Sequence, residues 1–237
     1  MTTRRSRFFA AIAAIAVIAI YGSSFILGSP ASATTTATDP YGEVRTHLEL
    51  FGVPAIQVES LVAALDGGES WDVYDTEAKP VDRDRMIING MDYRIDRFAD
   101  GSFSAHGVEI PQVLTSGLIQ PMGIQACVVT GGTGFKNYDN CQIDGVWGAV
   151  VAGATGVDFT IVQGGYDRIR YAGVPFQRCL VGTTGSSPSL VASRMTETAS
   201  YRAFVRWQGD ASTVWGGSWN YWVELRVGRD TYSTVTS

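Results

Sequence analysis

The chain has 237 residues, of which 18 are basic and 23 acidic, so its formal net charge is −5, and 45% of its residues are hydrophobic. This length and apolar content are sufficient for one domain with a sizeable core. An acidic chain without a basic stripe is repelled by phosphate backbones, which argues against a nucleic-acid partner.

Residues 1–33 have the three-part pattern of a secretory signal peptide. Three arginines precede an apolar run over residues 8–27, and Ala31-Ser32-Ala33 ends the segment with small residues. The pattern predicts cleavage after Ala33. The alternative is an uncleaved membrane anchor, because residues 8–27 are just long enough to span a bilayer. The break at Gly22-Ser23-Ser24 favours cleavage.

Cleavage would leave a secreted, extracellular chain of 204 residues with a net charge of −8, since the leader contains three of the 18 basic residues and no acidic ones. We expect no stable membrane insertion after cleavage, because no second long apolar run follows.

Residues 34–38 are expected to form a disordered tail, and the segment 39–84 to form two short helices and an acidic loop that pack on the core. Asp39-Pro40 is typical of a helix start, and apolar residues then recur at helical spacing as far as Gly52. A second helix is predicted from Pro54 to the glycine pair at 67–68. His47 is expected at the surface of the first helix.

Residues 71–85 are acidic and are predicted to be irregular. Asp72, Asp75, Asp82 and Asp84 are candidate calcium ligands, since carboxylate oxygens at this density can hold the ion outside the cell. They lack the spacing of an EF-hand, and a solvated acidic loop is the simpler interpretation. No other metal site or cofactor is predicted.

From residue 85 to residue 237 the hydrophobic period changes to two, which predicts a β-sandwich domain. Residues 91–98 alternate cleanly, and Asp100-Gly101 is a strong signal for a two-residue hairpin turn. That turn would pair Ile95 with His106 and place His106 on the apolar face. His106 is therefore only a weak candidate for a catalytic base.

The remaining pattern indicates many short strands separated by glycine-rich turns, which is typical of an antiparallel sandwich, here expected to be jelly-roll-like. The predicted strands cover residues 124–129, 142–151, 158–163, 168–172, 176–181, 190–196, 201–207 and 221–227. The turn between the last two is predicted either at Gly209-Asp210 or at Gly216-Gly217.

Three cysteines occur in the chain, and export makes disulfides permissible. Cys127 and Cys141 flank a turn-rich segment, so a hairpin would bring them together, and we predict a disulfide between them. Cys179 is then left as a single thiol.

Aromatic side chains concentrate in the last predicted hairpin, where Trp215, Trp219 and Trp222 are candidate ligand-binding residues. Exposed rings on a β scaffold can stack on the apolar faces of sugars. The competing interpretation is that these rings cover the edge of the core.

The pattern as a whole resembles a family of secreted, β-rich actinobacterial proteins for which no activity is known. The resemblance is carried by Gly52-Val53-Pro54, Asp100-Gly101-Ser102, the cysteine hairpin, the segment 158–169 and the closing stretch 201–228. It implies export and a β-rich fold, and it supplies no catalytic residue.

These features favour a non-catalytic binding module for a cell-surface or environmental polysaccharide. One alternative is an exported hydrolase that uses His106 or a carboxylate pair such as Asp92 with Asp96, or Asp158 with Asp167. A second alternative is a secreted interaction or toxin-like protein that acts on other cells.

Overall fold

The computed structural model describes residues 39–113, 126–214 and 217–237. The predicted leader, the tail over residues 34–38 and Trp215 lie outside the described residues. None of the helices in the described part of the chain is long and apolar enough to cross a membrane.

Two α-helices and a short 3-10 helix precede the strands. They are α1 (Gly42–Leu50), α2 (Ala55–Gly67) and η1 (Asp72–Tyr74). Pro54 directly precedes α2, and Gly68 ends it in the left-handed conformation that glycine adopts without strain.

The expected surface position of His47 is wrong. Its side chain is 8% exposed and lies against the rings of Phe51 and Phe103. Because α1 lies on a sheet, the side of the helix that carries His47 faces the interior.

The strands form two sheets. The larger sheet contains β1 (Asp82–Ile88), β2 (Met91–Arg97), β3 (Phe103–Glu109), β4 (Gln112–Val113), β5 (Val128–Gly132), β6 (Phe135–Trp147), β7 (Val150–Val162) and β8 (Arg168–Cys179). The smaller sheet contains β9 (Thr183–Gly185), β10 (Ser189–Arg194), β11 (Ala203–Thr213), β12 (Ser218–Gly228) and β13 (Thr231–Thr236). All paired strands are antiparallel except β4 with β5.

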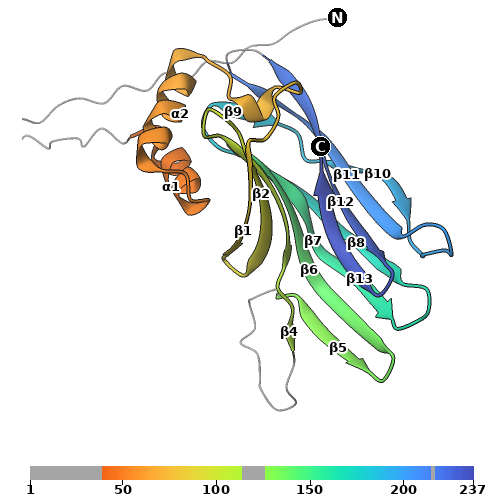
Figure 1. The fold of residues 1–237 in the computed structure, drawn as a ribbon. Coiled ribbons are helices and arrows are strands. Elements are labelled where there is room, and N and C mark those ends of the chain that lie inside the picture. Colours follow the sequence, from red (N-terminus) through yellow and green to blue (C-terminus); the bar gives the residue numbers. More distant parts are fainter. Residues whose placement is uncertain (1–38, 114–125, 215–216) are drawn as a thin grey trace, which may run out of the picture. The chain divides into compact units, whose positions relative to one another are not determined.

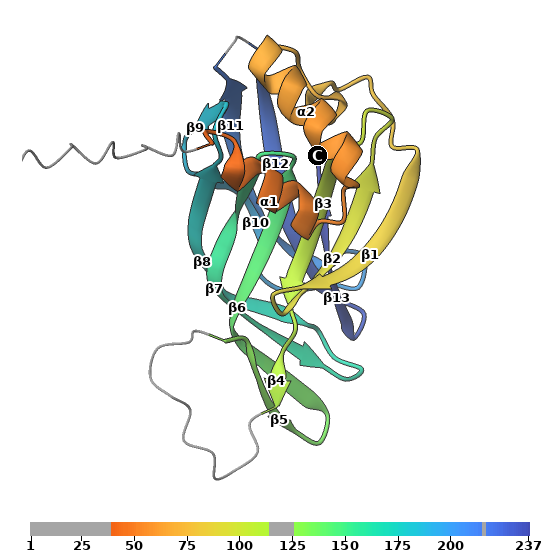
Figure 2. The ribbon, with the colours of Figure 1, turned by 90° about the vertical axis from the view of Figure 1, so that its left-hand side faces the viewer.

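Other elements pack on both faces of the larger sheet. The smaller sheet packs on one face through a core that includes Phe159, Trp207 and Tyr221. The helices α1 and α2 pack on the other face, around Leu48 and Tyr93 (Figures 1 and 2). The expected antiparallel sandwich with a short helical N-terminal segment is confirmed. In the larger sheet β3 pairs with β6, which also pairs with β5 and β7, and β8 follows β7; in the smaller sheet β10 to β13 are neighbours in chain order and β9 pairs with β11.

Several predicted boundaries are wrong. The irregular region over residues 71–85 contains the first half of β1, so the sheet begins at Asp82 rather than at residue 85. The predicted strand over residues 142–151 is interrupted by the turn that joins β6 to β7. The predicted strands at 168–172 and 176–181 are one strand, β8. The glycines expected to form a turn at 153–156 lie within β7.

A close approach of two backbones explains the glycine at position 153. A Cβ atom built on Gly153 would lie 1.9 Å from the carbonyl oxygen of Ile143 on β6. Only glycine allows the strands to come this close, so here it marks a contact between strands and not a turn.

The predicted β2–β3 register is wrong by one residue. Phe98 and Ser102 close a three-residue loop, with Gly101 in the left-handed conformation at φ +92°, so Asp100 and Gly101 are not the centre of a two-residue turn. His106 consequently pairs with Arg94, not with Ile95. A shift of one residue moves every side chain of a strand to the opposite face.

The disulfide between Cys127 and Cys141 is present, and it closes the β5–β6 hairpin as predicted. In the chain-entropy model a loop of this size contributes about 3 kcal/mol to stability.

The β11–β12 connection runs through Gly217, whose carbonyl oxygen accepts a hydrogen bond from the backbone of Thr213. The turn is therefore the second of the two predicted alternatives.

A candidate ligand-binding groove beside His106

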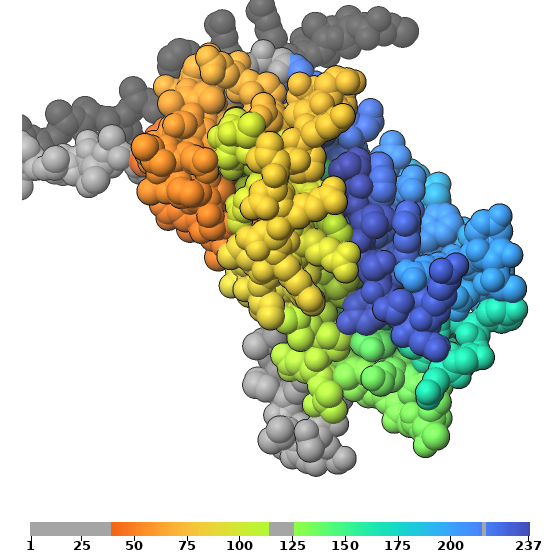
Figure 3. Space-filling view, in the orientation of Figure 1, coloured from red at the N-terminus to blue at the C-terminus, as the bar shows by residue number. Residues whose placement is uncertain are grey.

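A groove runs between the inner face of β1–β2–β3 and the edge strand β13. Figure 3 shows this last strand (dark blue) directly beside the segment that contains β1 and β2 (yellow). Two cavities, of about 380 and 400 Å³, open along it, and His106 lines both. We refer to them together as the His106 groove.

The one-residue shift in register explains why this groove is polar. It places Asp92, Arg94 and Asp96 of β2 on the same face as Ser104 and His106 of β3, looking toward β13. The alternating polar residues of β2 were expected to face solvent. They form the floor of the groove, because the smaller sheet ends at β13 and leaves this part of the larger sheet uncovered.

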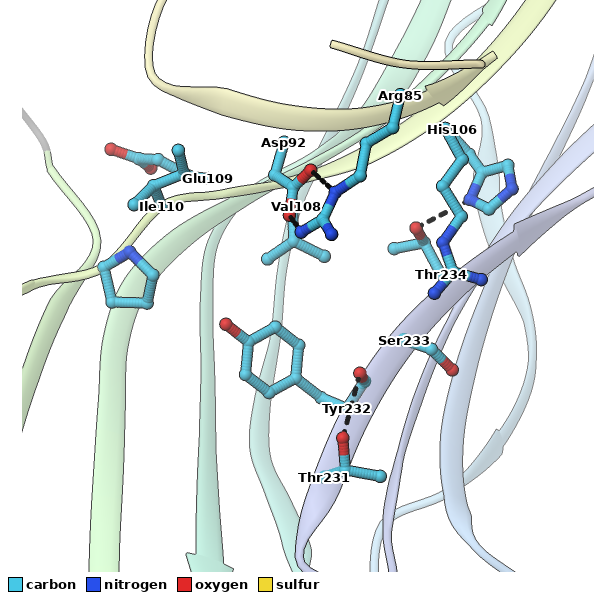
Figure 4. Close-up of a pocket in the computed structure, with 12 residues that line it drawn as sticks. Arg85, Asp92, His106, Val108, Glu109, Ile110, Thr231, Tyr232, Ser233 and Thr234 are labelled. Carbon is cyan, nitrogen blue, oxygen red and sulfur yellow. Dashed lines mark hydrogen bonds and ion pairs between the residues drawn. The ribbon is translucent and has the colours of Figure 1, made fainter. Parts of the chain in front are cut away.

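His106 lies at the centre of the groove and is half-buried. Its Nδ1 atom is 2.8 Å from the Oγ1 atom of Thr234 on β13 (Figure 4). Burial lowers the pKa of His106, and the positive charge of Arg94 lowers it further, while Asp96 opposes this shift. The ring is therefore neutral at pH 7 and is available for hydrogen bonding through Nε2.

Two ion pairs cross the floor of the groove. The Nε atom of Arg85 donates to Asp92 at 2.6 Å, and the Nε atom of Arg83 donates to Asp96 at 3.0 Å. The hydrogen bonds from Arg85 lower the pKa of Asp92. Arg94 is exposed, and no ion pair of its guanidinium is seen among the described residues. The floor thus presents a cation that a ligand can use.

The far end of the groove is aromatic. The rings of Tyr74 and Trp219 stack with their centroids 4.2 Å apart, and both line the cavity together with Phe98 and Trp147. At the opposite end, Tyr232 faces the Arg85–Asp92 pair across the opening, with Val108 behind them (Figure 4). Rings at both ends with hydrogen-bonding groups between them suit an extended polar ligand.

The three candidate tryptophans do not share one surface. Trp219 faces the groove, whereas Trp222 lies on the outer face of β12 beneath the guanidinium of Arg206, whose Cζ atom is 4.2 Å from the ring centroid. Trp215 lies outside the described residues. Of the tryptophans predicted to bind a ligand, Trp219 therefore lines the groove and Trp222 lies on a different surface.

The four candidate calcium ligands lie on two elements, Asp72 and Asp75 at η1 and Asp82 and Asp84 on β1, and each is engaged within the fold. Asp82 accepts a hydrogen bond from the backbone of Arg83 at 2.8 Å. Asp72 and Asp100 each accept the other's backbone N–H, at 3.2 and 2.8 Å. Asp75 caps a local turn, and Asp84 pairs with Arg97. Within residues 39–113, 126–214 and 217–237, no three histidine, cysteine or acidic side chains gather in a way that could hold a metal ion.

The carboxylate pairs considered for hydrolysis are engaged elsewhere. Asp92 and Asp96 each bind an arginine. Asp158 accepts a hydrogen bond from the backbone of Asn140, and the fully buried Asp167 accepts from the backbone of Val162 and Asp230. Burial also raises the pKa of the remaining thiol, Cys179.

Arg94, Tyr232 and Thr234 were not predicted as site residues. Arg94 sits in an alternating strand, where charge is normally interpreted as a solvent-facing side. Tyr232 and Thr234 belong to a strand that was not predicted at all. Only its Tyr-Ser-Thr-Val-Thr alternation could have indicated β13.

Comparison of the chain with protein-family models, with curated proteins and with solved structures finds no match. The functional conclusion consequently rests on the geometry of the groove.

Proposed function

We propose that this protein is an exported, non-catalytic binding module that holds a polysaccharide segment in the His106 groove. The observation that carries the proposal is the combination in one groove of stacked aromatic rings, a neutral histidine and the guanidinium of Arg94, which has no ion-pair partner among the described residues. The signal-peptide pattern and the disulfide support export, because disulfides persist in oxidising compartments.

The ligand chemistry follows from the lining groups. Sugar rings offer apolar faces to aromatic side chains and hydroxyls to polar ones, and the groove provides Trp219 for the first and Asn220, Ser104 and His106 for the second. Tyr74 stacks on both Trp71 and Trp219 and so supports the ring of Trp219. Arg94 adds a position suited to a carboxylate-bearing sugar. Asp92 supports binding as a carboxylate held by Arg85, and His106 does so as a neutral ring that is anchored to Thr234.

A sedimentation assay with insoluble peptidoglycan, chitin and cellulose tests this proposal. We expect the mature protein to co-sediment with at least one of them, and Trp219→Ala to weaken that binding about tenfold, which corresponds to the loss of one stacking contact. Trp222→Ala is the matched control, because it removes a tryptophan from the opposite face of the same strand.

Equal loss of binding in the two variants would contradict the proposal, as would the absence of sedimentation with all three polymers. Thermal unfolding of each variant, followed by circular dichroism, establishes that a loss of binding reflects the groove rather than the fold.

A further inference from the structure

The outer face of the smaller sheet carries a cluster of arginines, which we call the arginine face. Arg194, Phe204 and Arg226 occupy directly paired positions across β10, β11 and β12, and Arg206 pairs with Glu224 two residues further along. With Arg202 and Tyr201 they line a hollow of about 440 Å³. This face points away from the larger sheet and is separate from the His106 groove.

The charge of the arginine face is opposite to that of the whole chain. Four arginines line the hollow, and of the lining residues Glu224 is the one carboxylate. Glu224 is 3% exposed; its Oε2 atom accepts from Arg206 at 2.8 Å and its Oε1 atom accepts from Arg226. One carboxylate offsets one positive charge, so the hollow keeps an excess of three in a protein of net charge −5.

Aromatic rings hold these cations in place. The Cζ atom of Arg194 lies 4.7 Å from the ring centroid of Tyr201 and 5.5 Å from that of Phe204, and Arg206 lies over Trp222 at 4.2 Å. Cation–π contacts of this kind orient a guanidinium and reduce the entropy that it loses on binding. Trp222 therefore acts here as a support for Arg206 rather than as an open platform for a sugar.

The positions of the arginines on the sheet favour a ligand with more than one anionic group. The backbone positions of Arg194 and Arg226 are two strand spacings apart, about 10 Å. Because Arg206 and Arg226 both bind the carboxylate of Glu224, the cations left for a ligand are Arg194 on β10 and Arg202 just before β11, and two separate cations suit two oxyanions. A double-stranded nucleic acid carries about one charge per 1.7 Å and would extend from the hollow over the rest of a chain whose net charge is −5.

We propose that the arginine face is a second binding site, for a polysaccharide that carries phosphate or sulfate esters. Guanidinium groups bind such oxyanions through paired, charge-assisted hydrogen bonds. Arg194 and Arg202 supply the free cations, because no ion pair of either side chain is seen in the described part of the chain.

The double variant Arg194→Gln/Arg202→Gln tests the site without leaving Glu224 buried and unpaired, as the loss of Arg206 or Arg226 would. The matched control, Arg170→Gln/Arg178→Gln, removes the same charge from β8 on the other sheet. The probes are heparin for sulfate, inorganic polyphosphate for phosphate, single-stranded DNA of equal charge, and orthophosphate as a competitor, all at low salt.

We expect heparin or polyphosphate to bind the native protein and the control, and to bind the arginine-face variant at least about tenfold more weakly. Equal weakening in both variants would overturn the site, and so would full competition by orthophosphate, which would indicate a single-ion site. Tighter binding of DNA than of heparin would overturn the choice of a polysaccharide.

Discussion

His47 shows how the environment of one side chain creates pH-dependent stability. The imidazole lies under the helical layer against Phe51 and Phe103, and its Nε2 atom is buried with no hydrogen-bond partner among the described residues. Burial lowers the pKa of His47 to about 4; a hydrogen bond with the backbone of Gly148 opposes this shift, and the charge of Arg178 adds to it. In the unfolded chain the pKa is about 6.5.

The stability that His47 contributes in its neutral form is therefore complete above pH 6.5 and is lost as the pH falls toward 4. At pH 5 the expected loss is about 2 kcal/mol. In His47→Leu this part of the pH dependence should disappear, because leucine has no proton to bind. Urea unfolding of both proteins at pH 7 and pH 5 measures the difference.

Parallel changes in the two proteins between pH 7 and pH 5 would show that His47 is not the responsible group. His106 remains in both proteins and contributes equally, so it does not affect the comparison.

At the scale of single elements, the close contact between β6 and β7 depends on one missing side chain. The Cβ atom of an alanine at position 153 would overlap the carbonyl oxygen of Ile143, and both are backbone positions that cannot rotate away. We expect Gly153→Ala to lower the free energy of unfolding by about 2 kcal/mol or more. Chemical denaturation of the variant measures the loss.

Gly132→Ala in β5 is the control for this substitution. There the added Cβ atom lies 3.4 Å from an atom of the Phe135 side chain, which is an ordinary contact. If the two variants lost similar stability, the close approach of β6 and β7 would not be the cause.

Most elements with clean periodicity were predictable from the sequence, and those with mixed signals were not. The alternation of residues 91–98 and 221–227 predicted β2 and β12 because one face of each is buried. The first half of β1 has charged side chains throughout, and the glycines of β7 resemble a turn. In both segments the residues have little preference for a strand, and hydrogen bonds to a neighbouring strand determine the conformation.

At the scale of the whole molecule, the predicted export would determine where either proposed binding site meets its ligand. Processing after Ala33 predicts that the protein accumulates outside an actinobacterial host with Thr34 as its first residue. Intact-mass measurement of the culture supernatant tests this. Replacing Ala31 and Ala33 with leucine should block cleavage, because the peptidase requires small residues there.

Retention of the native protein in the cytosol with its leader attached would contradict this prediction. It would leave the groove and the arginine face without access to polymers outside the cell.

The candidate site was only partly predictable, for the same reason that the β2–β3 register was wrong. His106 was found as a residue type in a predicted strand, and Trp219 as one beside the last predicted turn. The face and the neighbours of His106 depend on the three-residue loop at Ala99-Asp100-Gly101. Arg94 and Thr234 became site residues because a β2 face that resembles solvent-exposed surface lies beside β13.

The sequence by itself determined the β-rich class, the two short helices and the Cys127–Cys141 pair, because hydrophobic period and turn chemistry act over a few neighbouring residues. Only the tertiary structure decided that the charged face of β2 lines a groove beside His106, and that Arg194, Arg206 and Arg226 meet on one surface. These placements depend on register and sheet order, which join residues far apart in the chain through contacts that no local pattern encodes.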